Sequence, residues 1–174
     1  MNALLERDQS LYYSVSAKTR APRRGEIEDR EYRFISEREF SELVERGAFL
    51  EWAEMFGHRS GTFREPVEEM LQAGRDVLLE IDVQGARQIR ERVPDAVLIF
   101  IVPPSREELE RRLRARGTED PEELRERLRV AFEEELPQQE WFDHVVENDT
   151  LERAADEVLA IIKGYRSEHE GLST

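Results

Sequence analysis

Two short apolar runs, residues 77–81 (VLLEI) and residues 97–102 (VLIFIV), constrain the fold of this chain most strongly. Both runs are nearly continuous rather than alternating, which is typical of strands that are buried on both faces of a parallel sheet. A segment with helical spacing follows each run, at residues 86–93 and from Ser105 to Leu113. This alternation predicts an α/β fold in which helices flank a parallel sheet.

Shorter patterns supply the other expected elements. Runs of β-forming residues predict strands at residues 11–16, 32–35, 49–56 and 144–147. Helices are expected from Ser36 to Gly47 and at residues 66–73, 122–135 and 151–165, and capping boxes at Ser36 and Ser105 mark two helix starts. Gly57 and Gly61 are assigned to a turn region, and residues 3–7 to a short helical stub.

The balance of charge excludes several classes of partner. The 174 residues include 40 acidic and 26 basic side chains, and the formal net charge of −14 repels nucleic-acid backbones. There is no cysteine, and hence no disulfide and no thiolate metal site. The longest apolar run, residues 96–102, is too short to span a bilayer, and the N-terminus has no signal segment. We therefore expect a cytoplasmic protein without nucleic-acid or membrane partners.

Basic side chains nevertheless gather at two places. The first cluster contains Lys18, Arg20, Arg23 and Arg24, and the second contains Arg111, Arg112, Arg114 and Arg116. Local positive charge on an acidic protein favours small, highly charged anions as ligands, and phosphate groups are the obvious candidates.

Residues 14–26 hold the first cluster in a loop that is stiffened by Pro22. Arg20 and Arg23 flank this proline, so both guanidinium groups can point at one phosphate. The hydroxyl of Tyr32 can add a third donor. Taken alone, the segment could also be a solvated basic loop.

Glu51 places a carboxylate inside an otherwise apolar strand. A buried glutamate needs hydrogen-bond donors, and the N1–H and N2 amino groups of guanine supply two of them. Thr62, which follows Gly61, offers a hydroxyl that could donate to a purine O6. A guanine-binding pocket is the functional interpretation, and a solvated surface position is the alternative for each residue.

Glu80 and Asp82 stand at the carboxyl end of a predicted buried strand, where α/β sheets bind their ligands. Being two residues apart, they share one face, which suits Mg²⁺ held through water or a contact to a base. Further along, Arg112, Arg116 and Arg127 lie in a helix–break–helix segment and could close over the oxygens of a transferring phosphoryl group. Solvated helix faces are the alternative for these arginines.

The chain contains, in this order, the motifs SVSAKTRAPRRGE with a later tyrosine, LEWAE, GT, LEIDVQGA, PPS, RLRARGTE and VVEND. From about Leu4 onward, this series resembles guanylate kinases. The resemblance implies a P-loop nucleoside monophosphate kinase fold with an inserted GMP-binding region and a mobile helical lid. It also implies transfer of the γ-phosphoryl group of ATP to GMP, with Mg²⁺ as the cofactor. The corresponding segments are residues 1–19 for a partial core, 20–75 for the GMP-binding region and 76–174 for the remaining core, with the lid at about 112–130.

Carried over position by position, the resemblance assigns roles to particular residues. Arg20, Arg23 and Tyr32 bind the GMP phosphate, and Ser16, Glu51, Thr62 and Asp82 read the guanine and support its pocket. Glu80 belongs to the acidic pair near the metal. Arg112, Arg116 and Arg127 are the catalytic residues of the lid, and Asn148 and Asp149 lie near the adenine edge.

One departure from the family pattern concerns the predicted phosphate site. Ser60 occupies a position where these kinases usually carry a tyrosine that contacts the phosphate. Arg59, its neighbour, is a candidate to compensate for the missing hydroxyl, and His58 is expected to be a surface turn residue.

The second departure is the absence of the family's glycine-rich phosphate loop. The chain has two lysines, Lys18 and Lys163, neither follows a glycine, and no glycine precedes Gly25. The loop that holds ATP and the central first strand before it are therefore missing, so we expect a truncated gene model that starts internally and a chain that is inactive alone. The alternative is a non-catalytic guanylate-kinase-like module that binds GMP or a phosphopeptide.

Overall fold

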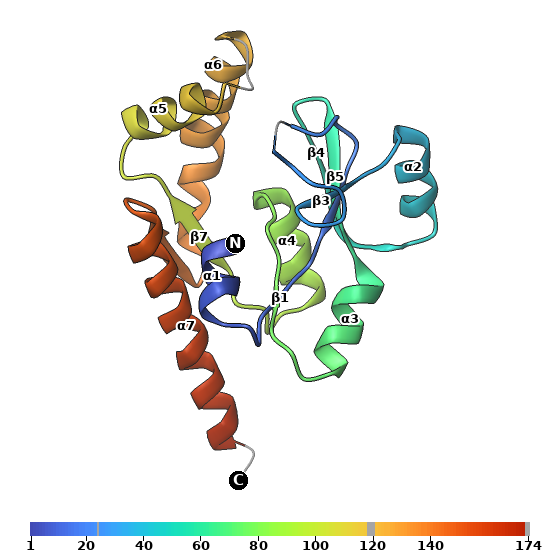
Figure 1. Ribbon diagram of the computed structural model, residues 1–174, viewed down its shortest axis with the longest axis vertical. Coiled ribbons are helices and arrows are strands. Elements are labelled where there is room, and N and C mark those ends of the chain that lie inside the picture. Colours follow the sequence, from blue (N-terminus) through green and yellow to red (C-terminus); the bar gives the residue numbers. More distant parts are fainter. Residues whose placement is uncertain (24, 118–120, 173–174) are drawn as a thin grey trace. The chain divides into compact units, whose positions relative to one another are not determined.

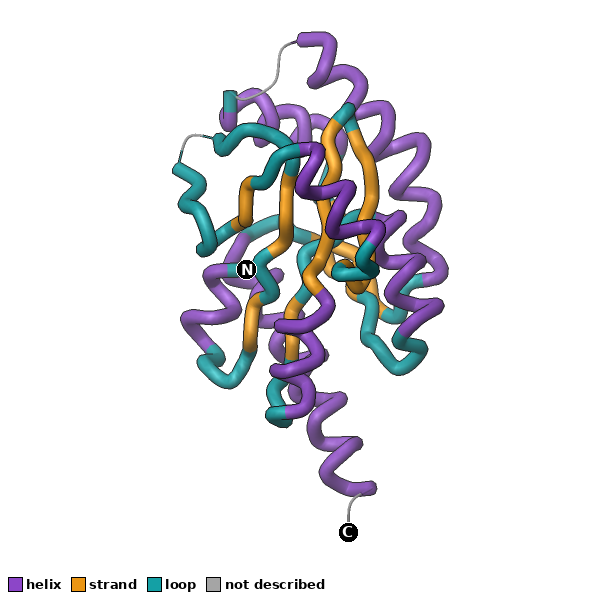
Figure 2. Tube along the Cα trace, turned by 90° about the vertical axis from the view of Figure 1, so that its right-hand side faces the viewer, coloured by secondary structure: helices purple, strands orange, loops and turns teal. Residues whose placement is uncertain are grey.

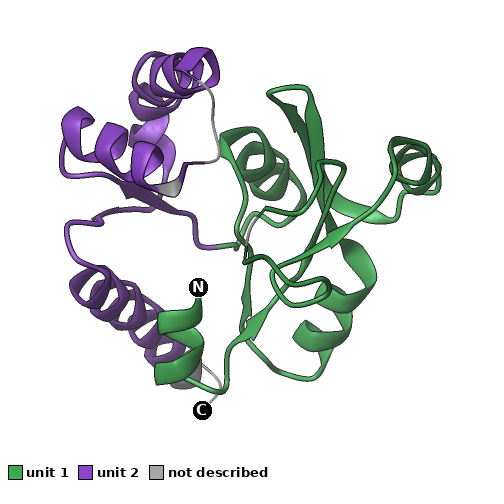
Figure 3. Ribbon diagram, turned by 45° about the horizontal axis from the view of Figure 1, so that its top comes forward, with its two compact units in different colours: residues 1–96 green, residues 97–174 purple. Residues whose placement is uncertain are grey.

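The computed structural model describes residues 1–23, 25–117 and 121–172 of the chain, which divides into two compact units, Met1–Ala96 and Val97–Thr174 (Figure 3). The boundary falls immediately before the apolar run at residues 97–102. The three functional segments expected from the resemblance stay a prediction, because compactness alone does not assign a function to a segment.

The first unit is built on a four-stranded sheet with the strand order β3-β2-β5-β4 (Figure 1). Its strands are β2 (Ser16–Lys18), β3 (Tyr32–Phe34), β4 (Phe49–Met55) and β5 (His58–Phe63). β2 runs parallel to β3 and antiparallel to β5, which forms a hairpin with β4. The core on one side of this sheet is apolar, and Phe40 and Phe49 stack there with ring centroids 4.6 Å apart.

The β4–β5 hairpin turns at Phe56 and Gly57, whose φ angles of 53° and 72° are both positive, as a two-residue hairpin turn requires. The predicted turn at Gly57 is thus confirmed. Gly61 lies inside β5, so the assignment of this residue to the turn region was wrong. A Cβ atom at Gly61 would lie 3.0 Å from a ring carbon of Phe49 and 3.1 Å from Cβ of Trp52. Glycine is needed here because these aromatic side chains approach closely, and not because the chain turns.

A β-bulge interrupts β4 at Leu50. Phe49 pairs with Phe63 and Glu51 pairs with Thr62, so two neighbours on β5 face residues that are two apart on β4. Because neighbours in a strand point to opposite faces, Phe49 faces the aromatic core and Glu51 faces the other side of the sheet. Phe49, Leu50 and Glu51 are all buried, which strict alternation would not produce.

Helices complete the first unit: α1 (Asn2–Arg7), α2 (Glu37–Glu45), α3 (Arg64–Gln72) and α4 (Val83–Arg92). α2 begins where its capping box predicts, since Oγ of Ser36 accepts a hydrogen bond from the Glu39 N–H at 3.1 Å. The single strand expected at residues 11–16 is wrong, because the chain passes between two sheets there. β1 (Tyr12–Tyr13) pairs in parallel with β6 (Val77–Leu78), whereas β2 belongs to the four-stranded sheet.

The second unit contains a two-stranded parallel sheet, formed by β7 (Ile99–Val102) and β8 (His144–Glu147). α5 (Arg106–Arg116) starts at the predicted cap Ser105 and ends at Gly117, whose φ of 63° is typical of a helix C-terminus. The helix expected at residues 122–135 is α6 (Pro121–Arg129), which continues as the π-helical turn η1 (Val130–Glu135) and the 3₁₀ turn η2 (Leu136–Trp141). The long helix α7 (Leu151–Leu172) follows β8 (Figure 2).

The α/β class is therefore confirmed. Outside the four-stranded sheet, parallel strands form two separate pairs, β1–β6 and β7–β8, and within the described parts of the chain no third strand joins either pair. None of the helices among these residues is both long enough and apolar enough to cross a bilayer.

Candidate functional site

Four of the predicted site residues form one row across the four-stranded sheet. Ser16 of β2 pairs in register with Tyr32 of β3 and with Thr62 of β5, and Thr62 pairs with Glu51 of β4. Side chains at paired positions point to the same face of a sheet. The row Tyr32–Ser16–Thr62–Glu51 therefore lies on the face opposite the stacked pair Phe40 and Phe49.

Glu51 is a buried carboxylate whose orientation is set by Thr62. Its Oε1 accepts hydrogen bonds from the Thr62 N–H at 3.0 Å and from the Thr62 hydroxyl at 2.6 Å. Burial raises the pKa of Glu51, and the charge of Asp82 raises it further, whereas the hydrogen bond from Thr62 lowers it. The one hydroxyl hydrogen of Thr62 is used in this contact, so Thr62 supports the carboxylate here, and its donation to a purine O6 stays a prediction.

The second oxygen of Glu51 lies close to Gly85 of α4, a residue to which sequence patterns gave no role. A Cβ atom at Gly85 would overlap Oε2 of Glu51 and would lie 3.2 Å from Cβ of Ile81. α4 is fixed against β4 by Gln88, whose amide donates to the Trp52 carbonyl at 2.6 Å. Only glycine therefore allows the first turn of α4 to lie this close to the carboxylate.

Asp82, another predicted site residue, caps the N-terminus of α4. Its Oδ1 accepts a hydrogen bond from the Gly85 N–H at 2.8 Å. Asp82 makes no other side-chain hydrogen bond among the described residues, so Oδ2 is available to a ligand. The helix start and the Glu51 carboxylate are thus joined through Gly85.

The loop after β2 presents Arg20, which is held by Glu26. The Nη1 and Nη2 atoms of Arg20 each donate to one oxygen of Glu26 at 2.6 Å, and Nη1 also donates to the Ala21 carbonyl at 3.0 Å. A guanidinium has five N–H donors, so Nε–H and one N–H of Nη2 are left without a partner among the described residues. These two hydrogens form the edge that binds a phosphate through two oxygens.

Glu26 also organises Arg23, and sequence patterns did not single it out. It accepts the Arg23 backbone N–H at 2.7 Å, and hydrogen bonding by Arg20 holds the pKa of Glu26 below its usual value. The only sequence signal for this role of Glu26 is that it lies three residues after Arg23. The pairing of Glu26 with Arg20 becomes visible only when the loop has folded back.

We expect Glu26→Gln to lower the free energy of unfolding by about 1–2 kcal/mol at neutral pH, because a neutral amide weakens three hydrogen bonds to a carboxylate. The pKa of Glu26 is depressed by folding, so its contribution is present above the pKa of the unfolded chain and is lost as the pH falls through the folded value. The difference between variant and wild type should therefore shrink in acid. Urea unfolding at several pH values measures it, and Glu45→Gln on exposed α2 is the matched control; a constant difference at all pH values would contradict this role.

Tyr32 lies beside the guanidinium group of Arg20, whose carbon is 5.4 Å from the centre of the Tyr32 ring. Burial is the main cause that raises the pKa of Tyr32 to about 12, so its hydroxyl keeps its hydrogen and can donate at neutral pH. Ser16 contributes a buried Oγ atom that finds no hydrogen-bond partner among the residues described. Such an atom is costly unless a ligand or water satisfies it.

Glu80, the last predicted site residue of the first unit, follows β6 and is exposed, whereas its neighbours Leu79 and Ile81 are partly buried. Its Oε2 accepts a hydrogen bond from the Tyr13 hydroxyl at 3.3 Å. Tyr13 also had no predicted role, and its pKa is raised chiefly by burial and then by the charge of Glu80. Within the described residues, no three histidine, cysteine or acidic side chains cluster as metal ligands.

The three predicted catalytic arginines belong to the second unit. Arg112 donates to Glu108 at 2.7 Å and to the Asp149 carbonyl at 3.0 Å. Arg127 is half-buried on α6, and the side chain of Arg116 lies outside the described residues. A groove of about 330 Å³ is lined by Ile101, Val102, Pro103, Leu109, Arg112, Leu113 and Asn148. The groove brings Arg112 near Asn148, and the action of the three arginines on a ligand of the first unit stays a prediction.

Arg59 does not compensate for the absent tyrosine at position 60, and this expectation was wrong. Its guanidinium is held on α2, where Nε donates to Glu37 at 2.7 Å and Nη2 donates to Oγ of Ser41 at 3.0 Å. It also stacks over the ring of Phe40 at 4.7 Å. Arg59 therefore strengthens the packing of α2, on the core side of the sheet.

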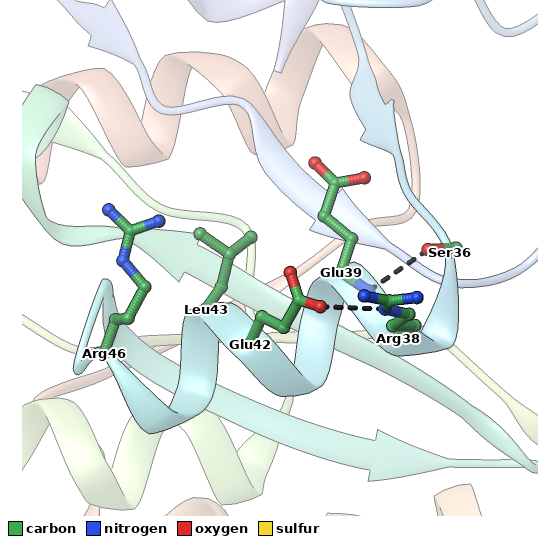
Figure 4. Close-up of a pocket in the computed structure, with 6 residues that line it drawn as sticks. All are labelled: Ser36, Arg38, Glu39, Glu42, Leu43 and Arg46. Carbon is green, nitrogen blue, oxygen red and sulfur yellow. Dashed lines mark hydrogen bonds and ion pairs between the residues drawn. The ribbon is translucent and has the colours of Figure 1, made fainter.

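A larger hollow, of about 470 Å³, lies on the outer side of α2 (Figure 4). It is lined by Ser36, Arg38, Glu39, Glu42, Leu43 and Arg46. Arg38 and Glu42 pair with each other at 2.9 Å across one turn of the helix. All six residues come from one helix and its two ends, so the hollow is a solvated helix face and not a candidate site.

The buried row, its neighbouring arginines and the capped helix form one connected arrangement on a sheet face. A sequence model of the guanylate kinase family matches residues 1–165, which is nearly the whole chain. The chain belongs to the guanylate kinase family.

Individual family members support this assignment. A guanylate kinase of Caldanaerobacter subterraneus subsp. tengcongensis is 47% identical over 160 residues, which cover 92% of this chain and 77% of that protein. One from Prochlorococcus marinus is 50% identical over 159 residues, covering 91% and 84%. The crystal structure of guanylate kinase from Anaplasma phagocytophilum matches with a TM-score of 0.78 and 38% identity, covering 94% of this chain and 79% of that one.

Proposed function

We propose that this chain forms the acceptor side of a phosphotransferase that moves the γ-phosphoryl group of ATP to GMP, giving ADP and GDP. The observation that carries the proposal is the buried Glu51 carboxylate, which two hydrogen bonds from Thr62 hold in one orientation beside Gly85. Guanine presents two neighbouring donors, N1–H and the N2 amino group, and a fixed carboxylate accepts from both. Adenine lacks this pair of donors, so the same site would reject it.

The residues around Glu51 supply the remaining contacts to the nucleotide. Ser16 Oγ and Asp82 Oδ2 are free to bond the base, because neither has a side-chain partner among the described residues. The open Nε and Nη2 edge of Arg20 and the hydroxyl of Tyr32 bind the phosphate, and Arg23 adds positive charge from the same loop. This set orients the acceptor phosphate and neutralises its charge, which is the main work of the protein in phosphoryl transfer.

The donor side of the reaction involves ATP with Mg²⁺. Glu80 and Asp82 offer two carboxylates, too few to enclose the ion but suitable for holding water ligands around it. When bound, Mg²⁺ would neutralise negative charge on the phosphate groups. Arg112, Arg116 and Arg127 stabilise the phosphoryl group as it moves, and Asn148 lines the groove that we assign to the adenine edge. A cytoplasmic location stays a prediction from the sequence.

The proposal is tested by equilibrium binding of GMP, AMP and guanosine to the chain, followed by an assay of GDP formation from ATP and GMP. We expect binding of GMP and guanosine and rejection of AMP. Turnover is measured for the chain alone and for a version extended by any upstream coding sequence with a glycine-lysine loop. Binding of AMP as tightly as GMP would contradict the proposal, and GMP binding without turnover in either version would favour a non-catalytic module.

Arg20→Ala should weaken GMP binding by about 10- to 100-fold, because charge-assisted hydrogen bonds to the phosphate are lost. Guanosine, which has no phosphate, should bind the variant and the wild type equally. Calorimetric titration of both ligands measures the difference. An unchanged affinity for GMP would remove Arg20 from the phosphate site.

A further inference from the structure

Lys18 lies on the same sheet face as the row that contains Ser16. It stands two residues after Ser16 on β2, and it pairs in register with Phe34 of β3 and Ser60 of β5. Because side chains two apart in a strand point the same way, Lys18 belongs to a second row directly beside Ser16. Its Nζ atom is 4.5 Å from the centre of the Tyr32 ring, and Arg20 lies over the same ring.

The ammonium group of Lys18 has no anionic partner in the part of the chain that the structure describes. It is half-buried, and among the described residues it makes neither a hydrogen bond nor an ion pair. Glu26 forms its ion pair with Arg20. The carboxylates of Glu80 and Asp82 influence the pKa of Lys18 through their charge but do not contact it. Withdrawing a cation from water is costly unless an anion compensates for it.

Phe34 stands opposite Lys18 on β3, but the neighbours of Lys18 on the β5 side leave room for such an anion. Ser60 stands directly opposite on β5, and Ala53 follows it in the same row on β4, so both positions carry short side chains. Ser60 is also the residue that departs from the family pattern, where a tyrosine is usual. Lys18 on β2 is thus paired with position 60 on β5, where this chain has serine in place of the usual tyrosine.

We propose that Lys18 is a phosphate ligand of the acceptor nucleotide, and that its ammonium group takes the place of a hydroxyl from residue 60. Lys18 and Arg20, gathered at the Tyr32 ring, would then reach one phosphate from two sides. Burial and the charge of Arg20 lower the pKa of Lys18 in the free protein, and a bound phosphate dianion would raise it again. This inference rests on the proposed binding of GMP.

The test compares Lys18→Met with Lys163→Met, a matched change at the exposed lysine of α7. Calorimetry measures the binding of GMP and guanosine to the wild-type chain and to both variants. Lys18→Met should weaken GMP binding by about 10- to 100-fold and reduce its dependence on salt, because one charge-assisted contact is lost. Guanosine binding should change less than about twofold, and Lys163→Met should change neither affinity.

A second comparison tests the exchange between positions 18 and 60. Lys18→Thr should weaken GMP binding as Lys18→Met does, and adding Ser60→Tyr should restore most of the loss. Urea unfolding of each variant confirms that it is folded, and the threonine variant replaces the methionine variant if the latter is not.

Three results would overturn the inference: unchanged GMP binding in the Lys18 variants, equal losses for GMP and guanosine, or no recovery in the double variant. The first two would leave the proposed function intact, because the wild type would still bind GMP. A wild-type chain with no affinity for GMP would overturn the proposed function and this inference together.

Discussion

Glu51→Gln should reduce the affinity for GMP by about 100-fold or more, because guanine then meets an amide in place of a fixed carboxylate. Two hydrogen bonds to a charged acceptor contribute about 1.5–3 kcal/mol each, and the amide nitrogen of glutamine would also oppose one guanine donor. Glu51 is only 4% exposed, so water cannot replace the lost contacts. Guanosine should lose affinity by the same factor, since the effect is on the base.

Calorimetric titration of GMP and guanosine measures this effect, and Glu54→Gln is its matched control. Glu54 lies on the same strand three residues further on, but it is exposed. The control should leave both affinities unchanged. If the Glu51 variant bound guanosine as tightly as the wild type does, the carboxylate would not read the base.

The same variant should also change how the stability of the protein depends on pH. Folding raises the pKa of Glu51, so its favourable contribution is present below the pKa of the unfolded chain and is lost as the pH rises through the folded value. Glutamine does not titrate. The free energy of unfolding of the variant, relative to the wild type, should therefore increase from acid to neutral pH, and urea unfolding across this range would show it.

Gly85→Ala should damage both the site and the fold. The added methyl group would overlap Oε2 of Glu51 and lie 3.1 Å from its Cδ, inside a region that is already packed. Overpacking of this kind costs about 1–3 kcal/mol of stability. The carboxylate can yield only by leaving the two hydrogen bonds from Thr62, so GMP affinity should fall by about 100-fold as well.

Gly164→Ala makes the same chemical change inside α7, and it serves as the matched control. Apart from its own helix backbone and chain neighbours, no heavy atom of the described residues lies within 4 Å of a Cβ atom at Gly164, so alanine should stabilise the helix there by about 1 kcal/mol. Thermal unfolding and GMP titration of both variants give the comparison. Equal stabilisation by the two substitutions would show that the approach of α4 to Glu51 does not depend on glycine.

Local signals in the sequence predicted some elements accurately. Ser36 and Ser105 cap α2 and α5 as their capping boxes indicate, because a cap depends on residues within one turn. β5 was missed because HRSGTF has neither an apolar alternation nor a run of strong strand formers. β5 is a strand because it pairs with β2 on one side and with β4 on the other, and such pairing cannot be read from the β5 segment alone.

The sequence named most residues of the candidate site, but it did not predict the contacts that connect them. The family resemblance named Arg20 and Glu51, yet the residues that hold them, Glu26 and Gly85, act through contacts formed only after folding. Lys18 was noted for its charge, and its place beside Ser16 and opposite Ser60 required the strand pairing. Contacts between segments were therefore the part that sequence patterns could not supply.

The bulge at Leu50 affects how the β4–β5 hairpin can tolerate insertions and deletions. In a strictly alternating strand, adding or removing one residue turns every later side chain to the other face. Leu50 is the extra residue of the pair Phe49–Phe63 and Glu51–Thr62, so its deletion would close the bulge and leave both partners on their own faces. Phe49 and Glu51 can thus be either adjacent in the chain or separated by one bulged residue, and in both cases each side chain keeps its own face of the sheet.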